Sequence, residues 1–162
     1  MSLKTASQRK LTSSRVNSTN ATFYVTSGLV LSLDAGNSSS YPGSGSTWYD
    51  LSGQGYNSTI NPGMTFTNAN GGAFHFNGGD AAYAQVPPGF GYDYSAGLTI
   101  NVWAKFTTGG GQWERLVDFG NGESNQNLIL CRNYLNSTMV MDIDTVNDSN
   151  LVPGEMPITW DG

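Results

Sequence analysis

Regular alternation of apolar and polar side chains in the run LTINVWAK is the feature that most constrains this fold. The apolar residues Leu98, Ile100, Val102 and Ala104 alternate with Thr99, Asn101, Trp103 and Lys105. Successive side chains of a β-strand point to opposite faces, so this spacing predicts a strand with one buried face. We expect it to be a central strand of a sheet.

Shorter runs with the same character cover much of the chain. They predict further strands at 29–33, 73–76, 81–86, 113–119, 127–134 and 138–144. The turn Asn77-Gly78-Gly79-Asp80 is expected to join two of these strands, with Phe74 and Phe76 facing the core. No segment shows sustained helical periodicity. With 21 glycines and only 12% charged residues, the 162-residue chain suits one loop-rich, all-β domain.

Four sequence blocks carry a resemblance to a known family. LVLSLDAGN, WYDLSGQGYNST, FHFNGGDAAYAQVP and LTINVWAKF together resemble the laminin-G-like, concanavalin-A-like jelly-roll domains. The resemblance covers roughly residues 28–162 and implies an antiparallel β-sandwich. Such domains include carbohydrate binders, adhesion modules, glycosidase accessory domains and virion components, so it leaves the activity open.

The C-terminal segment ITWDG departs from the pattern of that family. In the domains that the chain resembles, such a segment leads into a further hairpin that helps to close the sandwich. The expected sandwich is therefore incomplete at the C-terminus, closed in another way, or covered by a neighbouring chain, because unpaired strand edges accept another strand.

Basic residues gather at the N-terminus. Residues 1–22 contain Lys4, Arg9, Lys10 and Arg15 and no acidic residue, a charge of +4, whereas three bases and twelve acids give the remainder −9. This polar segment predicts a flexible basic arm preceding a sandwich domain at 23–162. The arm is either a solvated leader or an interchain tether that orders along an acidic neighbour. Four dispersed cations without aromatic partners only weakly indicate nucleic-acid recognition. Neither a signal peptide nor a transmembrane span is apparent.

Residues that carry catalytic chemistry are few. Cys131 is the only cysteine and is expected to be a buried structural thiol, while the single histidine, His75, excludes sites that need two imidazoles. Asp142 and Asp144 would share a strand face, as a glycosidase carboxylate pair requires. The glucanases that share the sandwich fold place glutamates there, so we predict no catalytic site.

Two kinds of binding site fit the loops. Calcium prefers carboxylate and carbonyl oxygens, which makes Asp80 the first candidate ligand, followed by Asp50 and Asp118. Alternatively, Asp50 and Asp80 cap turns through hydrogen bonds to backbone amides. Glycans stack on exposed aromatic rings, and the candidates are Tyr92, Tyr94 and Trp113. The alternative for these rings is packing.

The preferred function is a noncatalytic structural or adhesion component of a virion or other extracellular assembly, with other protein subunits as partners. The rival is a lectin-like module that binds glycans, with or without calcium. A glycoside hydrolase ranks third.

Overall fold

The computed structural model confirms an all-β, antiparallel protein. It describes residues 26–88, 90, 97–106, 113–120, 127–132, 138–145, 148–151 and 156–157. Within these ranges the one helical element is a 3₁₀ turn at Ala69–Gly71. The strands are β1 Thr47–Trp48, β2 Ser58–Ile60, β3 Met64–Thr67, β4 Ala73–Phe76, β5 Ala84–Gln85, β6 Glu114–Phe119, β7 Leu128–Arg132, β8 Thr138–Thr145, β9 Asp148–Leu151 and β10 Met156–Pro157.

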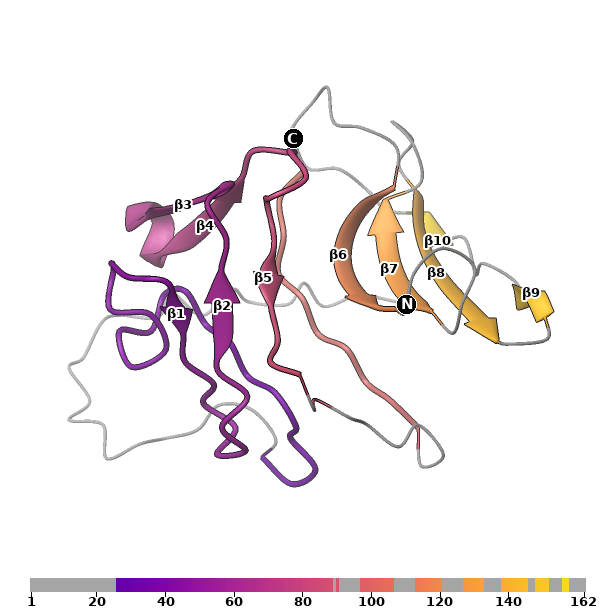
Figure 1. Cartoon of the computed structure of the whole chain (residues 1–162), viewed down its shortest axis with the longest axis horizontal. Coiled ribbons are helices and arrows are strands. Elements are labelled where there is room, and N and C mark those ends of the chain that lie inside the picture. Colours follow the sequence, from indigo (N-terminus) through magenta and orange to yellow (C-terminus); the bar gives the residue numbers. More distant parts are fainter. Residues whose placement is uncertain are drawn as a thin grey trace, which may run out of the picture.

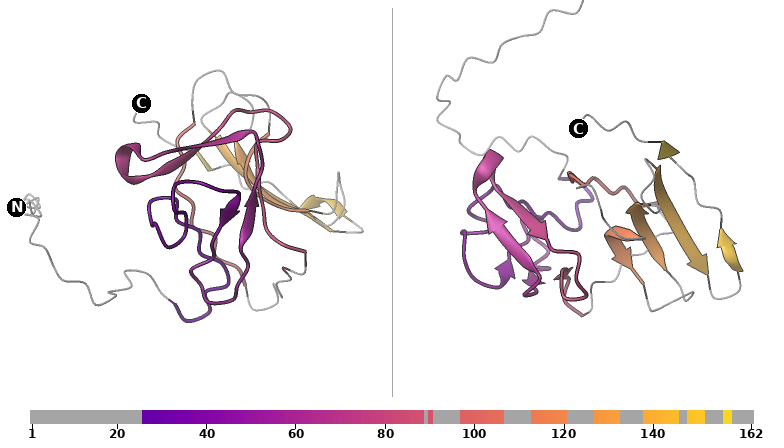
Figure 2. Two further views of the ribbon diagram at one scale, coloured as in Figure 1. Left: turned by 60° about the vertical axis from the view of Figure 1, so that its left-hand side comes forward. Right: turned by 90° about the horizontal axis from the view of Figure 1, so that it is seen from above.

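The strands form two groups (Figure 1). The first group contains two sheets, one of β1, β2 and β5 and one of β3 and β4. The second group is a third sheet, in which β6, β7 and β8 lie in order and β9 and β10 both pair with β8. Seen from above, the β3–β4 pair and the β6–β10 sheet lie at opposite ends of the described part (Figure 2).

The first group is built on one long, bent hairpin. Ile60 of β2 pairs with Ala84 of β5, and further along the same two stretches of chain Met64 of β3 pairs with Phe76 of β4. At the bend, Gly63 donates a backbone hydrogen bond to the carbonyl of Ala81. A Cβ on Gly63 would lie 2.7 Å from the Ala82 backbone, so the bend requires a residue without a side chain.

Aromatic rings fill the space above this hairpin. Tyr41, which is buried, packs against Phe66 and Phe74 with ring centroids 4.9 and 4.7 Å away, and Trp48 lies 4.7 Å from Phe74. Such tilted and edge-on pairs add stability beyond their buried area. Phe76, expected in the core, is about half exposed instead, so that expectation is wrong.

The third sheet buries residues on both faces. Register places Leu128, Arg132 and Met139 on one face, and Ile129, Cys131 and Val140 on the other; all six are buried. A bulge between Arg115 and Val117 lets β6 follow β7. Phe119 on β6 lies 5.4 Å from Phe90, whose ring lies 4.9 Å from Tyr56. These three rings connect the two groups of strands.

Most of the predicted strands form, but the one predicted pairing is wrong and two predicted strands are absent from the described residues. Strands at 73–76, 113–119, 127–134 and 138–144 correspond to β4, β6, β7 and β8 within a few residues. The turn 77–80 does not join a hairpin, because β4 pairs with β3 and β5 with β2. The runs 29–33 and 98–105 belong to no ladder of the described residues. The expectation that Val102 and Ala104 lie on a buried face is also wrong, because both residues are exposed. Alternation indicates which face a sheet would bury, but not whether a partner strand lies alongside. The jelly-roll sandwich stays a prediction.

Candidate interaction surface

The segment 97–106 stands out because it belongs to no ladder of the described residues and most of its residues are exposed. Its residues 98–105 make no backbone hydrogen bond to any other residue that the structure describes. Residues 101–105 are all exposed. The side chain of Trp103 is 96% exposed and that of Val102 41%. A hydrophobic run with unused backbone donors and acceptors is a typical place for another protein surface to bind.

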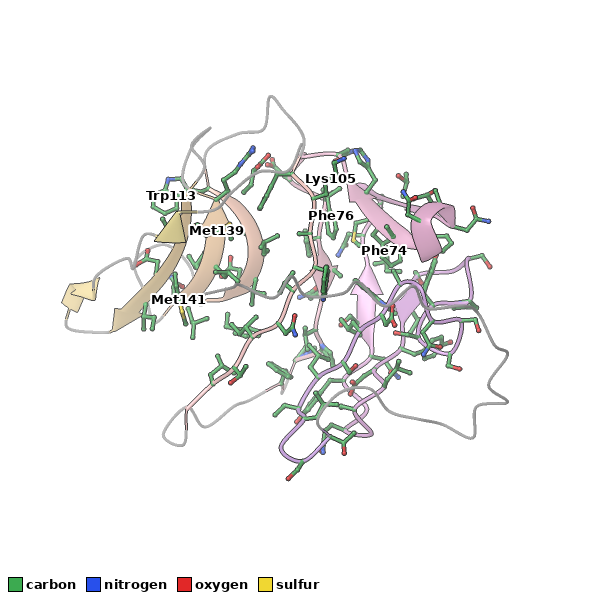
Figure 3. The ribbon with its side chains drawn as sticks, turned by 180° about the vertical axis from the view of Figure 1, so that it is seen from behind. Phe74, Phe76, Lys105, Trp113, Met139 and Met141 are labelled. Atoms are coloured by element: carbon green, nitrogen blue, oxygen red, sulfur yellow. The ribbon has the colours of Figure 1, made fainter. Side chains whose placement is uncertain are left out.

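One end of this segment is held against the third sheet. The guanidinium of Arg132 lies 4.8 Å from the centre of the Phe106 ring, a cation–π contact. Arg132, only 5% exposed, also forms an ion pair with Glu114, its cross-strand neighbour on β6. Figure 3 shows Lys105 beside this end, with Trp113 and Met139 on one side and Phe74 on the other. The anchor at Phe106 leaves residues 101–105 in solvent.

Sequence reasoning missed the three-residue anchor of Glu114, Arg132 and Phe106. The only sequence signal for this anchor was that Glu114 and Arg132 carry opposite charges on consecutive predicted strands. That signal is weak, because the sequence does not say which residues of the two strands lie opposite each other. A buried ion pair requires both partners, since removing one leaves the other charge desolvated.

The glycan-binding candidates are not brought together within the described residues. Trp113 is 43% exposed and immediately precedes β6, with a φ of 59° that bulky side chains rarely adopt. Tyr92 and Tyr94 lie outside the described residues. The glycan site therefore stays a prediction with one placed residue.

Asp50 lies at the centre of a hydrogen-bonded loop cluster. Its Oδ1 accepts hydrogen bonds from the backbone N–H groups of Ser32 and Ser52, both at 2.9 Å. Its Oδ2 accepts from the Ser52 hydroxyl at 2.6 Å and from the Tyr56 N–H at 3.1 Å. The backbone of Leu51 also donates to the carbonyl of Ser32. One carboxylate thus joins the 29–33 segment to the 50–56 loop, where a ladder was expected.

These hydrogen bonds also act on the ionisation of Asp50. Partial burial raises the pKa of the carboxyl, but the hydrogen bonds from Ser52, Ser32 and Tyr56 lower it more, so the pKa lies below its ordinary value of 3.8. The geometry supports the turn-capping interpretation of Asp50.

The other calcium candidates lie apart from Asp50. Asp118 forms an ion pair with Arg115 at 2.5 Å, and Asp80 lies in the exposed turn after β4. Among the residues that the structure describes, no three His, Cys, Asp or Glu side chains gather closely enough to hold a metal ion. Calcium binding stays a prediction.

Cys131 and His75 have the surroundings expected of structural residues. The Cys131 side chain is fully buried on β7, and burial raises the pKa of the thiol, as does the charge of Asp142. A protonated, inaccessible thiol is a poor nucleophile. His75 lies on β4 opposite Thr65 and is exposed.

In comparisons with known proteins, no family model, no curated protein and no solved structure matches the chain. The resemblance to laminin-G-like domains therefore stays a prediction. In the described part of the chain, no helix has the length and apolar character needed to cross a membrane. The four basic residues of the predicted arm lie outside that part.

Proposed function

We propose that the protein is a noncatalytic structural or adhesion component of a protein assembly, such as a virion or other extracellular particle. The segment 98–105, with its exposed residues 101–105, carries this proposal. Tryptophan is enriched in the centres of protein interfaces, and a Trp103 side chain that is 96% exposed has no packing role within the described chain. An interface gives this side chain and the unpaired backbone around it a function.

Two further features support an assembly role. The residues with the most chemical character, Asp50 and Cys131, have structural explanations in their hydrogen bonds and burial. The basic arm carries +4 and the rest of the chain −9, which suits an arm that tethers one subunit to the acidic body of the next. The virion and extracellular setting follows from the family resemblance in sequence.

Sedimentation velocity of the full chain over a wide concentration range tests the proposal. We expect the weight-average sedimentation coefficient to rise with protein concentration as copies associate. A chain that stays monomeric at every concentration would contradict the proposal, and calcium-dependent retention of that monomer on a glycan array would favour the lectin-like rival.

Glycan recognition is the second candidate, favoured by the exposure of the Trp113 ring beside β6. A ring with a free face stacks on the C–H face of a sugar. If this function holds, Trp113→Ala should abolish retention on the array, whereas Tyr49→Ala, at another exposed ring, should not. The double change of Tyr92 and Tyr94 to alanine tests the rest of the predicted site.

A further inference from the structure

We infer that residues 101–105 form an antiparallel strand pair with the same residues of a second copy of this chain, centred on Trp103. The inference deepens the proposed function and depends on it, because it names the partner and the surface through which copies associate.

The backbone of the segment is ready for strand pairing. Residues 98–105 have no backbone hydrogen bond to another described residue, so the N–H and C=O groups of the exposed residues are free to pair with an incoming strand. The segment is already anchored at Phe106 through Arg132. Anchoring reduces the conformational entropy that pairing would remove.

The sequence of the segment is complementary to itself in this register. A two-fold axis at Trp103 sets Trp103 opposite Trp103, Val102 opposite Ala104 and Asn101 opposite Lys105. In an antiparallel pair, side chains directly opposite each other project from the same face of the two-stranded sheet, so the two Trp103 rings lie side by side on one face. Aromatic pairs at opposed positions stabilise a sheet, and the lysine meets an amide rather than a second lysine.

Charge favours a second copy meeting at this stretch. The chain carries a net −5, so two copies repel each other over most of their surfaces. Residues 97–106 contain one charge, that of Lys105, and no acid. Among the described strands β6 also lies at the edge of its sheet, but it carries three charged residues, Glu114, Arg115 and Asp118, within six positions. The segment 101–105 is thus a place where copies approach without like-charge contact.

Paired cysteines test the register in the full chain. Opposed residues of an antiparallel pair have Cα atoms about 4.5–5.5 Å apart, within the range that a disulfide spans. Mixing the Val102→Cys and Ala104→Cys proteins under mild oxidation should give about tenfold more covalent dimer than either protein alone. In the mixture the two cysteines lie directly opposite each other, whereas in either protein alone each cysteine lies opposite a residue that is not a cysteine. A mixture of Ser44→Cys and Gln54→Cys, both in exposed loops, serves as the matched control.

Substitution of the central ring gives an independent measurement. Trp103→Ser should raise the dimer dissociation constant by at least about tenfold, while Trp103→Phe should retain most of the affinity. Circular dichroism checks that both variants keep the β fold.

The outcomes separate this inference from the proposed function. If copies associate but the mixed cysteines do not link and Trp103→Ser associates normally, the inference is overturned and the assembly function stands. If the chain is monomeric at every concentration, both are overturned. Crosslinking of Val102→Cys to a cysteine placed at Val117 in the same chain would show that the segment pairs with β6, and this too overturns the inference.

Discussion

Replacing Asp50 with asparagine removes the acceptor that joins the 29–33 segment to the 50–56 loop. The carboxylate accepts four hydrogen bonds, from two backbone N–H groups at Oδ1 and from the Ser52 hydroxyl and Tyr56 N–H at Oδ2. Asparagine has one oxygen and one NH₂ group, so whichever way the amide turns, at least one backbone N–H loses its acceptor. The bonds that remain also lose the strengthening given by the negative charge.

The expected loss of stability follows from these contacts. A part-buried donor left without an acceptor costs about 1–3 kcal/mol, and weakening the other bonds adds about 1 kcal/mol. Asp50→Asn should therefore lower the free energy of unfolding by about 2–4 kcal/mol. For a chain of this size, that corresponds to roughly 6–12 °C in Tm.

Differential scanning calorimetry at neutral pH provides the assay, with Asp80→Asn as the matched control. Asp80 lies in an exposed turn, and its neutralisation should change the free energy of unfolding by no more than about 0.5 kcal/mol. Equal Tm values for Asp50→Asn and Asp80→Asn would refute the structural role assigned to Asp50. So would a large calcium-dependent rise in Tm that Asp50→Asn alone abolishes.

Three further predictions follow from the same structure. The folded pKa of Asp50 is depressed, so the stability that its charged form contributes is present above the ordinary pKa of 3.8 and is lost as pH falls through the folded pKa. The Tm gap between wild type and Asp50→Asn should therefore narrow below about pH 4, and a constant gap would contradict this. Gly63→Ala should lower the free energy of unfolding, measured with urea, by about 1–3 kcal/mol, because the added Cβ meets the Ala82 backbone. Gly79→Ala is the control: its Cβ meets only the Asn77 side chain, so the free energy of unfolding should fall by less than about 1 kcal/mol. Cys131 should react with iodoacetamide at least about a hundredfold faster in urea than in buffer, and comparable rates would show that the thiol is accessible.

The fold class was predictable because strand patterning is local. Val140 and Cys131 are apolar residues in runs whose period matches a strand, and both are buried as that pattern predicts. The same reasoning failed for the run 98–105, the clearest pattern in the chain. Its pairing depends on a partner elsewhere in the chain or on another chain, which alternation does not identify.

Pairing was the part that local signals did not predict. The Asn77-Gly78-Gly79-Asp80 turn predicts a tight hairpin, yet β4 returns along β3 and β5 along β2. The nested arrangement depends on the bend at Gly63, where two backbones come close. Its sequence signal is a single glycine among 21.

The interaction surface was recognisable only in part. Trp103 was assigned to a polar strand face, and its exposure agrees with that face, but the 96% exposure of its side chain became visible only in three dimensions. The Glu114–Arg132–Phe106 anchor likewise depends on the β6–β7 register. Registers are set by tertiary packing, so these residues could not be grouped in advance.

Hydrogen exchange of the amides in 98–105 tests the interaction surface most directly, measured by mass spectrometry at low and at high protein concentration. Interchain pairing predicts rapid exchange in the dilute protein and marked protection in the concentrated protein, with the β7 amides protected in both. Protection that is already complete in the dilute monomer, or absent at both concentrations, would contradict the account.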